Sequence, residues 1–140
     1  MKIIVTKERE LLKEICNLLM LIGIFPNRKG FTAIKYAIFL SVKAYQENVP
    51  IDIYKSLSKC LEKSVSLLEA NMRSAFKSAK DSNMLNKLND ILGFNVVNNY
   101  ISLSNLQIIA LLTQYVIDNT AVINSAAPIP CPFENSLTVN

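Results

Sequence analysis

The sequence contains no histidine, which is the side chain that proteins use most often as a general base and as a transition-metal ligand. Its three cysteines, Cys16, Cys60 and Cys131, have none of the short spacings that form a zinc site. Acidic residues are few and mostly alternate with bases, as in KERELLKE at residues 7–14, a pattern typical of a solvated helix face. We therefore predict that the protein is not an enzyme and uses no metal or cofactor.

Glycine is also scarce, with only Gly23, Gly30 and Gly93. Neither the GxGxxG nor the GxxxxGK[ST] pattern occurs, which argues against a loop that cradles phosphates. The apolar run NLLMLIGIF at residues 17–25 is too short to cross a bilayer and is followed by Pro26. No secretory signal is visible, and the odd cysteine count does not suggest a disulfide framework. We expect a cytoplasmic protein with no membrane partner.

What remains is a sequence that predicts an all-α protein. Apolar residues recur at helical spacing in about six segments, at residues 7–22, 31–45, 53–61, 65–80, 81–92 and 105–118. Asp52 and Ser104 are expected to cap two of these helices, and residues 94–104 are expected to form an extended loop. We expect a helical domain over residues 1–119. Residues 120–140 contain three prolines at alternate positions and are expected to be an extended or disordered tail.

The net charge of +4 is concentrated in one stretch of the chain. Residues 54–87 hold seven bases and three acids, a difference of 7 − 3 = +4, while the rest of the chain has eight of each. A local basic patch on a neutral body favours a polyanionic partner. A solvated helix surface that keeps the protein soluble explains the same lysines equally well.

Residues 52–80 have the pattern of a helix-turn-helix. Two amphipathic helices are separated by Glu62, Lys63 and Ser64, a turn of suitable length. The inward stripe of the second helix would be Val65, Leu68, Met72, Ala75, Phe76 and Ala79, and the opposite line would be Ser66, Ala70, Arg73, Lys77 and Lys80. Lys63 and Ser64, at the helix start, are placed to meet a phosphate. Ser66 and Glu69 also fit a capping box that stabilises the helix without touching DNA.

Three segments resemble the C-terminal effector domain of the stage-zero sporulation response regulator family. IGIFPNRKGFTAIKYAI at residues 22–38 is similar to the family's IGVPAHIKGYLYLREAI, KSVSLLEANMRSAFKSA at 63–79 to TTASRVERAIRHAIEVA, and ILGFNV at 91–96 to LFGYTV. The resemblance covers roughly residues 11–116. It implies a six-helix domain whose fourth helix enters the DNA major groove at a short promoter box. It also implies two copies side by side on double-stranded DNA and contact with the sigma subunit of RNA polymerase.

The likeness is partial on the helix that would read DNA. The family presents Ser, Arg, Glu, Arg, Arg and His there, and this chain keeps Ser66, Glu69 and Arg73 but has Leu67, Ala70 and Ser74 at the other positions. Arginine is the usual bidentate reader of guanine, so we expect an altered sequence preference. The candidate DNA-binding residues are Lys63, Ser64, Ser66, Glu69, Ala70, Arg73, Ser74, Lys77 and Lys80.

Two functions are consistent with these observations. The first is a sequence-specific DNA-binding transcription regulator that stands alone, without the receiver domain that precedes this domain in the family; an excised piece of a longer regulator would look the same. The alternative is a protein-interaction module that keeps the fold but has lost DNA reading. Such a module would bind the polymerase, a full-length regulator or a second copy of itself. The basic excess favours the first.

Overall fold

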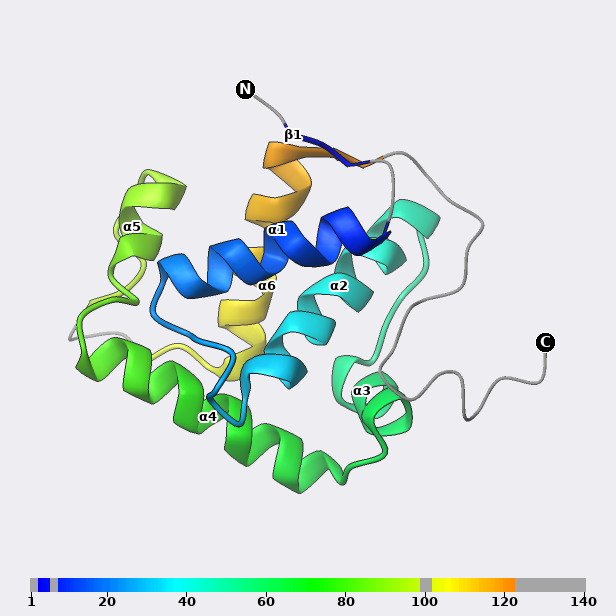
Figure 1. Ribbon diagram of the computed structural model, residues 1–140, viewed down its shortest axis with the longest axis horizontal. Coiled ribbons are helices and arrows are strands. Elements are labelled where there is room, and N and C mark those ends of the chain that lie inside the picture. Colours follow the sequence, from blue (N-terminus) through cyan, green and yellow to red (C-terminus); the bar gives the residue numbers. More distant parts are fainter. Residues whose placement is uncertain (1–2, 6–7, 99–101, 123–140) are drawn as a thin grey trace.

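Helix α2 (Phe31–Glu47) is the centre of the fold, because most of its side chains are buried. It packs against α1 (Glu8–Leu21), α3 (Ile53–Leu61), α4 (Val65–Asp81) and α6 (Asn105–Asn119) (Figure 1). The computed structural model describes residues 3–5, 8–98 and 102–122. Its core is a single cluster of apolar side chains around α2, as expected for an amphipathic helical domain. No helix within these described residues is long and apolar enough to span a membrane.

The all-α prediction is confirmed, and all six predicted helices are present. The shortest, α5 (Lys87–Leu92), ends at Gly93, whose φ of 82° lies in the left-handed region that favours glycine. Residues 94–98 and 102–104 form a loop without helix or strand, as predicted.

A small parallel strand pair was not predicted. It joins β1 (Ile3–Val5) to β2 (Thr120–Val122), with Ile3 opposite Thr120. β1 consists only of β-branched residues, which favour strands. The first residues of the expected tail are therefore part of the fold. The tail's three prolines lie outside the described residues, and the boundary at residue 119 stays a prediction.

Helix starts are set by short polar side chains. Asp52 accepts a hydrogen bond from the Lys55 amide, and Ser104 forms a reciprocal capping box with Gln107, so both predicted caps are confirmed. α4 is capped by Ser64, whose hydroxyl accepts from the Leu67 amide at 3.2 Å. The suggested capping box of Ser66 and Glu69 is therefore wrong, since Ser66 lies inside the helix, two residues beyond the cap.

The loop between α1 and α2 is fastened to α4. Gly30 has an ordinary φ of −81°, but a Cβ there would collide with the main-chain oxygen of Asn71 and lie 2.9 Å from the Ala75 Cβ. Arg28, two residues earlier, donates a 2.6 Å hydrogen bond to the Ser78 hydroxyl. Glycine is thus required by the close approach of two backbones, and the loop has a fixed position beside α4.

Three buried or half-buried residues, Lys43, Cys16 and Cys60, have side chains that ionise or form covalent bonds. The Lys43 ammonium, only 4% exposed, forms a 3.1 Å ion pair with Glu8, which is the pairing that a buried lysine requires. Cys16 is a free thiol, and burial raises its pKa. Cys60, at the end of α3, takes part in a disulfide, against the expectation drawn from the odd cysteine count.

Candidate nucleic-acid interface

The predicted helix-turn-helix is present as α3, a three-residue turn and α4. α3 and α4 are in contact. Glu62 ends α3 in the left-handed conformation with φ 56°, and Ser64 is extended and begins α4. α4 is one of the two longest helices and runs along the edge of the molecule opposite the strand pair (Figure 1). One of its faces is therefore free to meet a partner.

The inner face of α4 is almost as predicted. Leu68, Met72, Ala75, Phe76 and Ala79 are buried. Val65, which was expected to be inward, is instead 41% exposed. It is the first residue of α4, and the buried part of the helix begins only one turn later, at Leu68. The start of α4 therefore projects beyond the core.

Five exposed residues form what we call the crest of α4: Ser66, Leu67, Ala70, Ser74 and Lys77. Four of the five are uncharged, and three of them are small. Lys80 was expected on the same line, but it is only half-exposed. A helix turns by 3.6 residues, so a line drawn from Ser66 through Arg73 to Lys80 drifts from the crest towards the core.

The charges of α4 are largely neutralised within the helix. Arg73 Nη2 lies 2.7 Å from Glu69 Oε1, and Lys77 Nζ lies 2.8 Å from Asp81 Oδ2, each pair one turn apart. The hydrogen bond to Asp81 raises the pKa of Lys77. With three bases and two acids, α4 has a net charge of only 3 − 2 = +1. Further positive charge near the crest must come from other elements.

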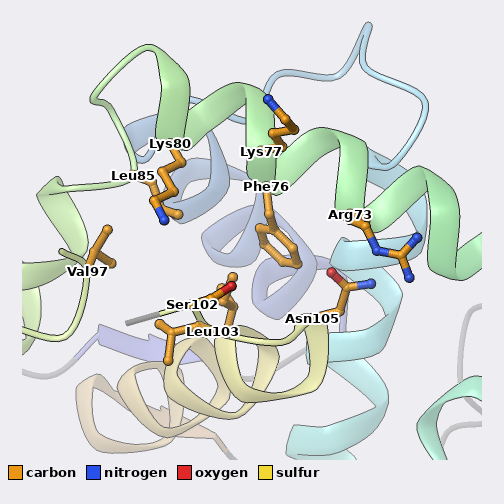
Figure 2. A pocket seen from close by; sticks show the side chains of 10 residues that line it. Arg73, Phe76, Lys77, Lys80, Leu85, Val97, Ser102, Leu103 and Asn105 are labelled. Atoms are coloured by element: carbon orange, nitrogen blue, oxygen red, sulfur yellow. The ribbon is translucent and has the colours of Figure 1, made fainter. Parts of the chain in front are cut away.

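One flank of α4 borders a pocket of about 230 Å³ that faces the start of α6 (Figure 2). Phe76 and Lys80 point from α4 towards this side (Figure 2), and Lys77 contributes to the rim of the same pocket. Arg73, Val97 and Leu103 also line the pocket. Lys80 thus places its charge beside the helix and its aliphatic stem against apolar side chains, as long basic residues often do.

Asn105 holds this flank in place. Its side-chain nitrogen donates to the Tyr54 hydroxyl at 3.2 Å and to the Glu69 main-chain oxygen at 3.1 Å. A residue of α6 therefore joins α3 to α4, and it fixes the two helices of the motif relative to each other. This role could not be predicted, because nothing in the spacing of Asn105 distinguishes it from any polar residue at a helix start.

The structure places all nine predicted interface residues on α4 or in the turn before it. Ser66, Ala70, Ser74 and Lys77 are on the crest; Glu69, Arg73 and Lys80 are on the flank that faces α6; Lys63 and Ser64 are exposed in the turn. The hydroxyl of Ser64 is occupied by its capping role. The fold also brings Arg28 and Lys29, from the loop fastened to α4, beside the motif. The run NRKG at residues 27–30 was the available signal for them.

The chain matches a known protein family. The family model described as "Sporulation initiation factor Spo0A C terminal" matches residues 15–116. The matched range takes in α2, α3, α4 and α5 completely and most of α1 and α6. No curated protein and no solved structure matches the chain.

Proposed function

Because the chain belongs to the Spo0A C-terminal family, whose members are DNA-binding effector domains of sporulation regulators, we propose that it is a sequence-specific transcription regulator that reads DNA with α4. The crest of α4 is the observation that carries this proposal. Its side chains are exposed, and Ser66, Ala70 and Ser74 are short. A helix with a narrow crest can lie deep in the major groove, where base edges are distinguished by hydrogen bonds and methyl contacts.

The four uncharged crest residues and the neighbouring Arg73 each have a chemical role in this arrangement. The hydroxyls of Ser66 and Ser74 can donate to or accept from a base edge, and Leu67 and Ala70 offer apolar contact to a thymine methyl. Arg73 is the one arginine on the helix and is suited to bidentate contact with guanine. Leu67 and Ala70 occupy positions where the resembling family has arginine, so the preferred box should differ from the family's.

The turn and the flanks would supply sequence-independent affinity. Lys63 and Lys80 lie beside the crest rather than on it, and contacts from such positions go to the phosphate backbone. A DNA partner agrees with the cytoplasmic location expected from the sequence. Contact with the sigma subunit of RNA polymerase and pairing of two copies on DNA stay predictions.

A protein-interaction module is the second candidate, favoured by one observation. Val65 and Leu67 are 41% and 47% exposed at the start of α4, where a partner could cover them. Scattered exposed apolar residues are normal on a protein surface, however. The basic excess of residues 54–87 favours DNA over this alternative.

Selection from random double-stranded DNA, followed by affinity measurements over a range of salt, tests the proposal. We expect one enriched box and a log–log salt slope of about −4 to −5, corresponding to roughly four to six phosphate contacts. Ala70→Glu should abolish binding without unfolding the protein, because it adds a negative charge at an exposed crest position. No binding at low salt, or a slope near zero, would favour the interaction module.

A further inference from the structure

A second pocket lies on the other flank of α4, between the start of α2 and the turn of the motif. It has a volume of about 490 Å³. Its polar lining consists of Lys29, Thr32, Lys35, Tyr36, Lys63 and Asn71. Three of these are lysines, contributed by the α1–α2 loop, α2 and the turn. No acidic side chain is among the described residues that line it.

None of the three lysines forms an ion pair with an acid of the described residues. Arg73, Lys77 and the buried Lys43, by contrast, each form an ion pair. Lys35 instead lies over the Tyr36 ring, with its ammonium 4.9 Å from the ring centroid, so an aromatic face holds the cation where an acid would neutralise it.

The remaining ionisable neighbours do not supply negative charge either. The Cys16 thiol lies near Lys35, but burial raises its pKa, and burial also raises the pKa of Tyr36. Both groups are therefore neutral at physiological pH, and Tyr36 keeps its hydroxyl proton as a donor. A concave site lined by several cations attracts an anion strongly, because its low-dielectric walls concentrate the electric field of the cations.

The position of this pocket beside α4 indicates that the anion is a phosphate of the DNA backbone. It shares Leu68 and Asn71 with α4, and the loop that carries Lys29 is fastened to α4 through Gly30 and the Arg28–Ser78 hydrogen bond. Arg73 and Lys80 line the pocket on the opposite flank. The crest of α4 thus lies between two cationic flanks. A helix in the major groove has the same surroundings, with one phosphate backbone on each side.

We propose that the Lys29–Lys35–Lys63 pocket holds a backbone phosphate of one DNA strand while α4 occupies the groove; this inference rests on the proposed function. The phosphate oxygens accept hydrogen bonds from the lysine ammonium groups, the Thr32 hydroxyl and the Asn71 amide. The contact is independent of base sequence, so it adds affinity and fixes orientation without adding specificity.

The first test compares two double variants in the salt dependence of DNA binding. Lys29→Ala with Lys63→Ala removes two exposed pocket cations, and Arg9→Ala with Lys13→Ala removes two exposed cations from α1, away from α4 (Figure 1). The pocket variant should make the slope about one less negative, because one phosphate contact is lost, and should weaken binding to selected and scrambled DNA by the same factor. The α1 variant should leave the slope unchanged. Equal slopes for both variants, or a loss confined to the selected box, would overturn the inference.

The second test locates the phosphate. Single methylphosphonate substitutions, which remove the charge of one phosphate at a time, are scanned across the selected site. We expect one position that weakens binding of the parent protein but has no effect on the pocket variant, while Lys77→Ala keeps that position sensitive. Purely additive losses at every position would contradict the proposal. A second outcome would also contradict it. Millimolar pyrophosphate could stabilise the free parent protein but not the pocket variant, while both proteins bind DNA equally well. The pocket would then bind a small anion and not a DNA phosphate.

The two proposals fail in different ways. If the parent protein binds no DNA at low salt, the proposed function is wrong. If the parent binds DNA and the pocket variant binds it equally well with the same salt slope, only the phosphate pocket is wrong. Measuring the unfolding transition of each variant separates both outcomes from loss of fold.

Discussion

Arg73 and Glu69 form a 2.7 Å ion pair one turn apart on α4, and both side chains are well exposed, at 63% and 44%. An exposed pair of this kind contributes little stability, typically below about 1 kcal/mol. The guanidinium is therefore held along the flank of the helix in the free protein, yet it can exchange the carboxylate for a base edge at low cost. Within the proposed interface, Arg73 is the residue that we expect to give sequence preference.

We expect Arg73→Ala to weaken binding to the selected box by about 1–3 kcal/mol and to affect scrambled DNA less, because a bidentate arginine contact discriminates between bases. Glu69→Gln is the matched control, since it removes the ion pair but keeps Arg73. It should not lower affinity for the box. Titrations of both variants on selected and scrambled duplexes give, for each variant, the ratio of its affinity for the selected box to its affinity for scrambled DNA. Equal losses on both DNAs would make Arg73 a phosphate contact only.

Lys77 and Lys80 should behave alike on DNA and differently in stability. Each alanine substitution is expected to make the salt slope about one less negative on any sequence. Lys80 is half-buried beside the pocket facing α6, whereas the Lys77 side chain is 74% exposed. Lys80→Ala should therefore lower the melting temperature, and Lys77→Ala should not. Thermal unfolding of the two variants distinguishes them. Identical melting temperatures would mean that the stem of Lys80 contributes no packing.

The helices and the orientation of α4 could be predicted from the sequence because both follow from local rules. The 3.6-residue period predicted Leu68, Met72 and Phe76 as inward, and the short turn after Leu61 predicted the motif. Lys80 was misplaced because a line of residues followed over four turns departs from the axis of the helix. The short-range pattern therefore predicted which face of α4 is buried, but it did not predict which residues lie at the border between the buried and the exposed face.

The flanks of the interface could not be predicted, because they depend on contacts distant in sequence. Lys29 and Lys63 line one pocket only because Gly30 lets the α1–α2 loop approach α4. Asn105 joins α3 to α4 from a helix that begins some 40 residues after Ser64. The strand pair likewise joins residues from the two ends of the described chain. Hydrophobic periodicity contains no information about such contacts between residues distant in sequence.

Gly30→Ala tests the attachment of the loop to α4. The added Cβ would meet the backbone of Asn71, which cannot move aside as a flexible side chain would, so we expect a loss of about 1–3 kcal/mol in unfolding free energy. Gly93→Ala is the comparison: its Cβ would meet nothing within 4 Å, and its cost comes only from the left-handed φ of 82°, about 1 kcal/mol. Only Gly30→Ala should also weaken DNA binding, since it displaces Lys29 from the motif. Denaturant unfolding and DNA titration of both variants provide the comparison.

Ser64→Ala tests the start of α4. Loss of the hydroxyl that accepts from the Leu67 amide should cost about 1 kcal/mol of stability. Ser66→Ala, two residues later and exposed, should cost almost nothing and yet weaken binding to the selected box if its hydroxyl contacts a base. Chemical denaturation of the two variants measures the first effect. If Ser66→Ala lost more stability than Ser64→Ala, the result would instead support the capping box of Ser66 and Glu69, which the structure excludes.

Leu67 and Ala70 provide the sharpest test of how α4 meets DNA. Both are exposed on the crest, so replacement by arginine should change stability little. Leu67→Arg with Ala70→Arg adds two long donors at the positions where the resembling family has arginine, and each bidentate guanine contact is worth about 1–3 kcal/mol. We therefore expect the double variant to gain more affinity for the sporulation family's promoter box than for scrambled DNA. Added charge alone would raise both affinities by the same factor, so the ratio of the two is the quantity to measure. An unchanged ratio in a folded variant would mean that α4 does not present its crest to the groove, and the exposed Val65 and Leu67 would then favour a protein-binding face.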